Sequence, residues 1–465
     1  MDATALSGAE KYAHTVTGAL QDQFIALGLG IGGRTLVLTQ FEKGGKALEI
    51  SAVDDNTAFS MAAGAAHLAL KCGSNWRHMG RLFGVARSKK KALGKFLGIC
   101  FRKMLAREGH RYSLATRTNG KAMSERMTPE AAQRLWDTHD LFALGRMAHA
   151  RRFELHPESW VTYIVDRNIN YTNVCVSGCR FCAFFRPPGH TQGFVLSHSE
   201  LEHKVQETVD VGGYQILLQG GMHPELPLGF YLEMLGFLKI RFPQVAVHGF
   251  SPPEIWFLAA NEGRSLAEII AELKQAGLDS IPGGGAEILT DRMRHQVSPN
   301  KCSAAQWLAV MEEAHQQGLR TTATMMFGQG ETMAERFQHL EALRDLQDRT
   351  GGFTAFIPWT FQPRNTQIER TEASSHEYLK FLALARLYLD NIENIQASWV
   401  TQGPLVGQLA LLWGANDFGS TMIEENVVAA AGVHFRLPET TIRDIVKRAG
   451  FVPRRRRMDY TLCEA

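Results

Sequence analysis

Residues 160–182 read Trp160-Val-Thr-Tyr-Ile-Val165-Asp-Arg-Asn168-Ile-Asn-Tyr-Thr-Asn-Val-Cys175-Val-Ser-Gly-Cys179-Arg-Phe-Cys182, and this stretch carries the most specific signal in the chain for its fold class. Its first part, Val161–Val165, is apolar and β-rich and predicts a buried strand. Its second part is a loop that carries three cysteines in C-x3-C-x2-C spacing, with an aromatic residue before the last. A strand followed by a loop with reactive side chains is typical of the first unit of a parallel βα fold.

The three cysteines point to metal chemistry. Three thiolates on one short loop can bind three irons of a four-iron cluster, because soft sulfur ligands suit iron–sulfur centres, and the fourth iron is then left for a small molecule. A structural zinc site is an alternative; it normally takes four ligands, and His190 could complete it. A disulfide framework is another, but it would need an oxidising compartment. The other cysteines stand singly and are interpreted as packing residues: Cys72, Cys100, Cys302 and Cys463.

Length and composition are those of a globular protein. The chain has 465 residues, of which 45% are hydrophobic and 21% charged, so disorder is not expected. No apolar stretch approaches the ~20 residues that span a bilayer, and the N-terminus lacks the pattern of a secretory signal. With the cysteine pattern, these features predict a protein of the reducing cytoplasm with no membrane span.

Charge is distributed unevenly along the chain. The segment 87–121 contains eleven Lys or Arg and one acid, within a total of 50 bases and 47 acids. A second basic run is Arg454-Arg455-Arg456-Arg457. The basic excess is therefore local, and no nucleic-acid partner is predicted.

Residues 1–122 differ in texture from the rest and are interpreted as an N-terminal extension. It is either an appended segment or upstream sequence included by an early start codon, since Met123-Ser-Glu-Arg-Met127-Thr-Pro reads like a natural N-terminus. Gly28-x-Gly30-x-x-Gly33 matches a dinucleotide fingerprint by letter, but it precedes a strand-like run instead of following one, so its context is wrong.

A helical lead-in is predicted for residues 123–160. Thr128-Pro129-Glu130 supplies a capping hydroxyl, a proline at the first position and an acid in the first turn. The helix is expected to run to about Arg151 and to lean on the domain that follows it, residues 161–465.

That domain alternates β-rich and helical segments, which predicts an α/β fold, a (β/α)8 TIM-type barrel with a C-terminal helical tail. An open doubly wound sheet is the alternative, but its glycine fingerprint is absent from the first βα turn. The predicted strands are 161–165, 214–219, 245–250, 278–281, 321–326, 353–359, 395–400 and roughly 411–414. The predicted helices are 201–211, 230–242, 265–276, 304–318, 334–348 and 376–392, and the short crossover 404–410 precedes the last strand.

Polar and glycine-rich motifs follow six of these strands. Glycine lets a backbone approach a ligand closely and offer bare amide and carbonyl groups. Each motif alone is also consistent with a turn, but together they predict a binding site at one end of the barrel. They are Gln219-Gly-Gly-Met-His-Pro224, His248-Gly-Phe-Ser-Pro-Pro-Glu-Ile255, Pro282-Gly-Gly-Gly-Ala-Glu287, Met325-Met-Phe-Gly-Gln-Gly-Glu-Thr332, Pro358-Trp-Thr-Phe-Gln-Pro363 and Gly414-Ala-Asn-Asp-Phe-Gly-Ser-Thr421.

With these motifs the sequence, from about Met123 to Tyr460, resembles the radical S-adenosylmethionine (SAM) superfamily. It resembles in particular the menaquinone and deazaflavin cofactor branch. Four motifs are most similar to the cyclic dehypoxanthine futalosine synthases of the futalosine pathway: Leu217-Leu-Gln-Gly-Gly-Met-His-Pro224, Ile281-Pro-Gly-Gly-Gly-Ala-Glu-Ile-Leu289, Phe356-Ile-Pro-Trp-Thr-Phe-Gln-Pro363 and Gly414-Ala-Asn-Asp-Phe-Gly-Ser-Thr-Met-Ile-Glu-Glu-Asn-Val-Val428. The resemblance does not extend to residues 1–122.

The resemblance implies two cofactors, a [4Fe–4S] cluster and SAM, and it implies roles for individual residues. Cys175, Cys179 and Cys182 would ligate the cluster, whose open iron would chelate SAM. The implied cofactor contacts are Phe181, Gln219, Gly220, Gly221, Ser251, Gly328 and Glu331. The implied catalytic groups are His223, Glu254, Glu287 and Asp417, each a polar residue at a strand end.

The implied reaction is the cyclisation of dehypoxanthine futalosine. A 5′-deoxyadenosyl radical would take hydrogen from C4′ of the substrate's ribose, the carbon radical would add to the benzoate ring, and loss of one electron and one proton would restore aromaticity. An electron donor such as flavodoxin or ferredoxin is implied as a partner. The alternatives are aminofutalosine synthase, a deazaflavin-precursor synthase, and a non-catalytic iron–sulfur electron-transfer protein.

Overall fold

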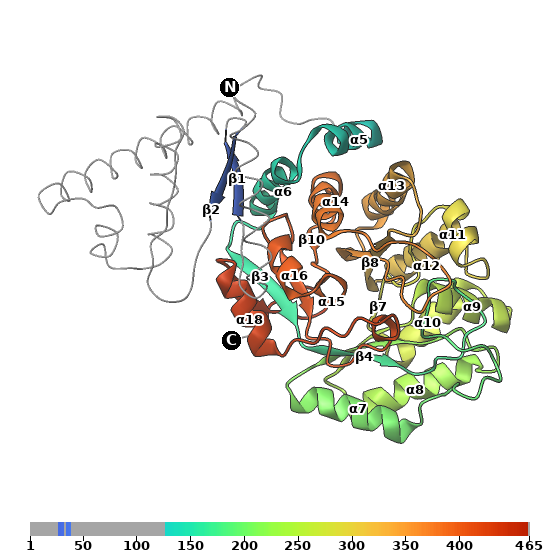
Figure 1. Cartoon of the computed structure of the whole chain (residues 1–465). Coiled ribbons are helices and arrows are strands. Elements are labelled where there is room, and N and C mark those ends of the chain that lie inside the picture. Colours follow the sequence, from blue (N-terminus) through green and yellow to red (C-terminus); the bar gives the residue numbers. More distant parts are fainter. Residues whose placement is uncertain (1–26, 32–33, 39–125, 464–465) are drawn as a thin grey trace, which may run out of the picture. The chain divides into compact units, whose positions relative to one another are not determined.

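Seven parallel strands form a curled central sheet, hydrogen-bonded in the order β10-β9-β8-β7-β6-β5-β4 (Figure 1). The computed structural model describes residues 27–31, 34–38 and 126–463. The sheet follows chain order without a reversal, as expected for a barrel and not for a doubly wound sheet. Its strands are β4 Asp166–Asn170, β5 Gln215–Gln219, β6 Ala246–Gly249, β7 Ser280–Ile281, β8 Arg320–Phe327, β9 Phe353–Thr360 and β10 Asn394–Ile395. The predicted TIM-type α/β class is confirmed.

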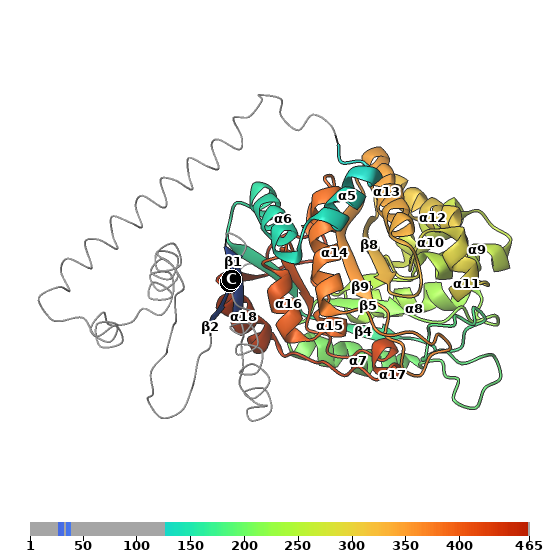
Figure 2. The same ribbon diagram turned by 45° about the horizontal axis from the view of Figure 1, so that its top comes forward.

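Helices lie between consecutive strands and cover the outside of the sheet (Figure 2). The six predicted helices are present within a few residues of the predicted ends, and several begin at a reciprocal capping box, such as Ser197 with Glu200 and Thr332 with Glu335. Two further helices, α9 and α11, follow β6 and β7. The helices are α7 His198–Asp210, α8 Leu228–Arg241, α9 Pro252–Glu262, α10 Leu266–Ala276, α11 Asp291–Val297, α12 Ala304–Gln316, α13 Met333–Thr350 and α14 Ser375–Tyr388.

The first predicted strand does exist, but it is not the first strand of the central sheet, so that part of the prediction is wrong. The run 160–164 forms β3, Trp160–Ile164, which belongs to a separate three-stranded sheet in the order β11-β3-β12. The first strand of the central sheet is β4, whose sequence Asp-Arg-Asn-Ile-Asn is mostly polar. All five of its residues are buried. Hydropathy did not identify this strand because its polar side chains are buried against other polar groups.

The last predicted strand is also misplaced. Residues 411–414 form turns after α16, Pro404–Ala410, and the strand in this region is β11, Asp417–Ser420. A bridge between Gln396 and Asp417 joins β11 to the end of β10, and β11 runs parallel to β3. Beyond β11, the amide of Asn168 on β4 donates to the carbonyl of Glu424 at 3.3 Å. The eighth position of the barrel is therefore occupied by β11 and the segment that follows it.

The C-terminal part continues from this edge. The predicted seventh strand, 395–400, is reduced to β10, because Trp399–Gln402 forms the short helix α15. Helices α17, Val427–Ala430, and α18, Glu439–Arg448, lead to β12, Val452–Arg455, which pairs in parallel with β3. The basic run 454–457 thus lies in and just after a strand.

The lead-in consists of two helices, not one. Thr128 caps α5, Pro129–Thr138, as predicted, with its Oγ1 accepting from the Ala131 amide at 3.2 Å. Asp140 then caps a second helix, α6, Leu141–Leu155, by accepting from the Ala143 amide at 2.6 Å. The break falls at His139–Asp140 because an aspartate that caps a new helix competes with continuation of the first.

Chain contacts divide the protein into Met1–Ser124 and Glu125–Ala465. In the first unit the described residues are an antiparallel hairpin of β1, Leu27–Ile31, and β2, Arg34–Leu38. Gly28 and Gly30 therefore lie in a strand of a hairpin, not at a strand-to-helix turn, and the interpretation of residues 1–122 otherwise lies outside the described residues. Among the helices of the described ranges, none has the length and apolarity to cross a membrane.

Candidate active site

A cavity of about 390 Å³ occupies the interior of the curled sheet, a size typical of small-molecule sites. Its wall includes alternate residues of the strands, because successive side chains of a strand point to opposite faces. The strand register arranges these residues in layers: Asp166 beside Gln215 at the deep end, Asn168 beside Leu217 and His248 in the middle, and Asn170 beside Gln219 at the carboxyl ends. The interior of this barrel is therefore hollow, and its lining combines polar side chains of these strands with a larger area of apolar atoms.

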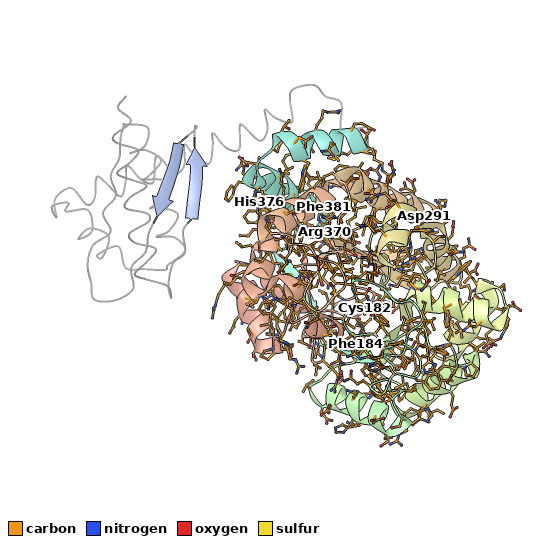
Figure 3. The ribbon with its side chains drawn as sticks, turned by 45° about the vertical axis from the view of Figure 1, so that its right-hand side comes forward. Cys182, Phe184, Asp291, Arg370, His376 and Phe381 are labelled. Carbon is orange, nitrogen blue, oxygen red and sulfur yellow. The ribbon has the colours of Figure 1, made fainter. Side chains whose placement is uncertain are left out.

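The cysteine loop closes one side of this cavity. Cys175, Cys179 and Cys182 all line it, and the first two are 9% and 3% exposed. Ser177 Oγ lies 3.1 Å from the sulfurs of both Cys175 and Cys179, and the Met222 amide donates to the sulfur of Cys175 at 3.3 Å. In Figure 3, Cys182 and Phe184 lie close together within the ring of helices.

The donor set fits a four-iron cluster. In the described ranges, no group of three or more His, Cys, Asp or Glu side chains converges on a single metal position. A cluster does not require such convergence, because each thiolate binds a different iron. Burial raises the pKa of the Cys179 thiol to about 11, so the isolated loop holds this thiol protonated, and binding of iron would displace the proton.

Two glycines let the loop after β5 press against the cysteine loop. A Cβ added to Gly221 would lie 2.1 Å from the carbonyl oxygen of Val174 and 2.8 Å from the Cβ of Cys175. A Cβ added to Gly220 would lie 2.4 Å from the ring of Tyr171. Both positions therefore require glycine, and the pair holds bare backbone beside the cysteines.

Glu254 links the segment before the cysteine loop, the glycine pair and the start of α9 by hydrogen bonds. Its carboxylate accepts from the hydroxyl of Tyr171 at 2.7 Å, the amide of Gly220 at 2.9 Å, and both the amide and the hydroxyl of Ser251. Ser251 and Glu254 form the capping box of α9. Both line the cavity, but their hydrogen-bonding groups are engaged with one another, and burial raises the pKa of the Glu254 carboxyl.

Glu287 forms an ion pair at the cavity wall. Lys301 Nζ lies 2.9 Å from its Oε1, and the same ammonium lies 5.0 Å from the ring centre of Phe181, on the cysteine loop. The other carboxylate oxygen of Glu287 is buried without a hydrogen bond from any described group. Glu287 has a φ of 43°, a strained conformation for a side chain of this size. Lys301 was not identified from the sequence, because it lies in the turn after α11.

Asp417 does not line the cavity. It is fully buried and paired with Arg456 of the C-terminal segment, whose guanidinium does line the cavity. The amide of Gly419 donates to Asp417 at 2.8 Å, so this carboxylate organises β11. Asp166 takes the place nearer to the cavity; it accepts from Ser420 and from Gln215 at 3.0 Å, and burial raises its pKa to about 6.

Three other predicted site residues do not line the cavity: His223, Gly328 and Glu331. His223 is half-buried, and its Nδ1 accepts from the amide of Glu225 at 3.2 Å. The side chain of Glu331 is buried; its carboxylate accepts from the amides of Gly328 and Gln329 at 2.8 and 2.9 Å and pairs with Arg336. The predicted residues that do line it are Cys175, Cys179, Phe181, Cys182, Gln219, Gly220, Gly221, Ser251, Glu254 and Glu287.

The structure adds polar residues that sequence motifs did not single out as site residues. Most come from strand interiors and from the C-terminal part of the chain, and Lys301 comes from the turn after α11. For the strand residues, period-two placement of polar side chains in β4 and β5 is the available signal. They are Asp166, Asn168, Gln215, His248, Lys301, Gln396, Ser420, Glu425 and Arg456.

A curled parallel sheet, a three-cysteine loop after its first strand, and a cavity between that loop and the strand interior define the radical SAM class of enzymes. Residues 169–343 match the radical SAM superfamily, and residues 350–465 match the CofH/MqnC C-terminal region. The chain resembles a solved methylornithine synthase in fold, with a TM-score of 0.57 and 17% identity over 71% of this chain and 95% of that one.

Two relatives with known names indicate which group within the superfamily this chain is similar to. The chain is 47% identical over 339 residues to the cyclic dehypoxanthine futalosine synthase of Halalkalibacterium halodurans, covering 73% of this chain and 92% of that one. It is 40% identical over 329 residues to the 5-amino-6-(D-ribitylamino)uracil–L-tyrosine 4-hydroxyphenyl transferase of Methanopyrus kandleri, covering 69% and 89%. The chain belongs to the radical SAM superfamily, in the group that contains the cyclic dehypoxanthine futalosine synthases. Its cofactors are accordingly a [4Fe–4S] cluster and SAM.

Proposed function

We propose that this enzyme converts dehypoxanthine futalosine to cyclic dehypoxanthine futalosine, a step of menaquinone biosynthesis. The observation that carries the proposal is the 47% identity to a cyclic dehypoxanthine futalosine synthase across 92% of that relative's length. A continuous match of 339 residues in a chain of 465 must include the cysteine loop, wherever the match begins. The cavity supports it, since its size suits a nucleoside-like molecule.

Cys175, Cys179 and Cys182 would hold the cluster, and the cluster with SAM supplies a 5′-deoxyadenosyl radical when both are bound. The backbone of Gly220 and Gly221 lies against the cysteine loop and offers polar groups for the methionyl end of SAM. The amides of Gly220 and Gly221 donate to Glu254 and to the carbonyl of Thr172, so the carbonyls of the pair are the groups offered, and no side chain of their own covers them. Gln219 lines the cavity at the same level.

The lower part of the cavity suits the substrate. Polar side chains of β4 and β5 supply partners for ribose hydroxyls, while Leu217, Ile357 and Trp359 supply apolar surface for a benzoate ring. Phe181 and Phe184 lie on the cysteine-loop side of the same cavity. An aromatic and aliphatic enclosure keeps water away from a primary radical, which would otherwise be quenched.

A second candidate is a deazaflavin-precursor synthase, favoured by the 40% identity to the 4-hydroxyphenyl transferase of Methanopyrus kandleri. That enzyme's name specifies a uracil derivative and tyrosine as substrates. Aminofutalosine synthase is a further rival of the same chemistry, and a non-catalytic iron–sulfur electron-transfer protein is a rival of another class. The futalosine cyclisation ranks first because identity and coverage are both higher for that relative.

Anaerobic turnover with competing substrates tests the proposal. Reconstituted and reduced enzyme is incubated with SAM and, separately, with dehypoxanthine futalosine or with tyrosine and the ribitylaminouracil. Flavodoxin or ferredoxin is supplied as the reductant in parallel with a chemical one. The expected result is 5′-deoxyadenosine and a cyclised product only with dehypoxanthine futalosine. A product only from the tyrosine mixture would replace the proposal with the second candidate, and absence of SAM cleavage in every mixture would contradict both.

A further inference from the structure

His248 occupies the middle layer of the cavity. On β6 it is paired in register with Leu217 of β5 and Ser280 of β7, one layer deeper than Gln219. A strand rises by about 6.6 Å over two residues, so His248 lies about that far below Gln219. Gln219 is at the end of the cavity that the cysteine loop closes. If the ribose of the substrate lies beside SAM at the layer of Gln219, the part of the substrate that extends into the barrel lies at the layer of His248.

One nitrogen of the His248 imidazole is hydrogen-bonded within the described residues, and the other is not. Its Nδ1 is hydrogen-bonded to the hydroxyl of Ser280 at 2.6 Å, and that hydroxyl can donate or accept. Among residues 126–463, no group hydrogen-bonds to Nε2, although His248 lines the cavity. Burial, with a smaller contribution from Arg456, lowers the pKa of His248 to about 3. The ring is therefore neutral at physiological pH and can present a lone pair.

Two carboxylates on the cavity wall, those of Glu254 and Glu425, already accept hydrogen bonds from the protein. Glu254 accepts four hydrogen bonds, the capacity of a carboxylate. Glu425 accepts from the amides of Val427 and Val428 at 2.8 and 2.9 Å and from Asn168 at 2.6 Å.

Two carboxylates remain to be compared with the imidazole. Glu287 is paired with Lys301 beside the cysteine loop. Asp166 lies one layer below the imidazole, with each oxygen accepting one hydrogen bond. His248 is thus the base with an open acceptor atom nearest to the middle of the cavity.

We propose that His248 is a catalytic residue that accepts the ring proton during rearomatisation, an inference that rests on the proposed cyclisation. Attack of the C4′ radical forms a C–C bond and leaves one hydrogen on the attacked ring carbon. That C–H bond breaks with its proton passing to Nε2 of His248, while the bonding electrons stay in the ring. The one excess electron passes to a one-electron acceptor, an oxidised iron–sulfur centre. The imidazolium so formed donates from Nδ1 to Ser280, which is a positioning residue.

The test combines a His248→Gln variant with an isotope. The substrate is deuterated at the ring position that loses its hydrogen, and 5′-deoxyadenosine and cyclised product are quantified separately. General-base catalysis contributes about 10²-fold or more, so product formation is expected to fall about 100-fold while 5′-deoxyadenosine formation falls much less. The variant should also show a larger primary isotope effect on product formation than the wild type, which a merely structural role would not produce.

Two controls make the outcome decisive. Asp166→Asn tests the competing base, and Ser280→Ala should reproduce the isotope effect of His248→Gln in weaker form. An unchanged isotope effect in His248→Gln, or an enlarged one in Asp166→Asn alone, would overturn the inference while leaving the cyclisation intact. If the wild type makes no cyclised product, the proposed function itself fails, and the two failures are distinguished.

Discussion

Replacement of Gly221 by alanine is expected to damage the cysteine loop through a single added methyl group. The new Cβ would lie 2.1 Å from the Val174 carbonyl oxygen and 2.7 Å from its carbon, so the two loops must separate by about 1 Å to reach ordinary contact distance. The obstacle is backbone and cannot rotate away. Separation would stretch the 3.0 Å bond from the Gly221 amide to Thr172 and the 3.3 Å contact from Met222 to Cys175.

The expected cost is about 1–3 kcal/mol in the free energy of unfolding, the usual range for overpacking. Urea unfolding of the apo-protein measures it, and iron and sulfide content after anaerobic reconstitution measures the effect on the cluster, which should fall. The matched control is Gly236→Ala on α8, where an added Cβ meets nothing within 4 Å. That control should keep full iron content and gain up to about 1 kcal/mol from helix propensity. Equal stability and iron content in the two variants would show that contact between Gly221 and Val174 does not limit the spacing of the two loops.

Four further changes have defined outcomes. Cys179→Ser should remove an iron ligand, so iron content and SAM cleavage fall while the unfolding midpoint of the apo-protein is nearly unchanged. Glu254→Gln should cost about 3 kcal/mol in urea unfolding, because an amide nitrogen then faces donors that the carboxylate accepted. Lys301→Met should cost about 1.5–3 kcal/mol, because Glu287 loses its nearer cation and keeps Arg294, whose Nη1 lies 3.8 Å from Oε2; Glu287→Gln combined with it should recover part of that loss. Asp166 should make stability depend on pH: its pKa is raised from 3.8 to about 6, so its contribution is full below about pH 4 and is lost as the pH rises through 6. Urea unfolding should therefore show about 1 kcal/mol less stability at pH 7 than at pH 5 from this group, a difference that Asp166→Asn should lack.

The helices and the class of fold could be predicted because their signals are local. Capping residues such as Ser197 and Thr332 stand at the start of amphipathic segments, and the order of strands and helices limits the architecture. The first and last strands were misplaced because they depend on what surrounds them. Asp166 and Asn168 lie on a strand whose polar side chains line the cavity, and hydropathy interprets such a polar run as a loop.

The cysteines of the site were visible in the sequence because their spacing is itself the signal. The glycine pair after β5 was also visible, although its physical reason, contact with Val174 and Tyr171, required the structure. Lys301 and Arg456 could not be found, since each reaches the cavity from a segment distant in sequence. Asp417 and Glu331 are also polar residues at strand ends, and in the structure their carboxylates are engaged by neighbouring groups of the protein.

In the proposed reaction, a radical made at the cysteine loop takes hydrogen from the ribose of a substrate held in the barrel. Substrate deuterated at C4′ tests this most directly, with 5′-deoxyadenosine analysed by mass spectrometry after anaerobic turnover. We expect transfer of one deuterium into 5′-deoxyadenosine, together with the cyclised product. Formation of 5′-deoxyadenosine without deuterium, while the cyclised product accumulates, would contradict it.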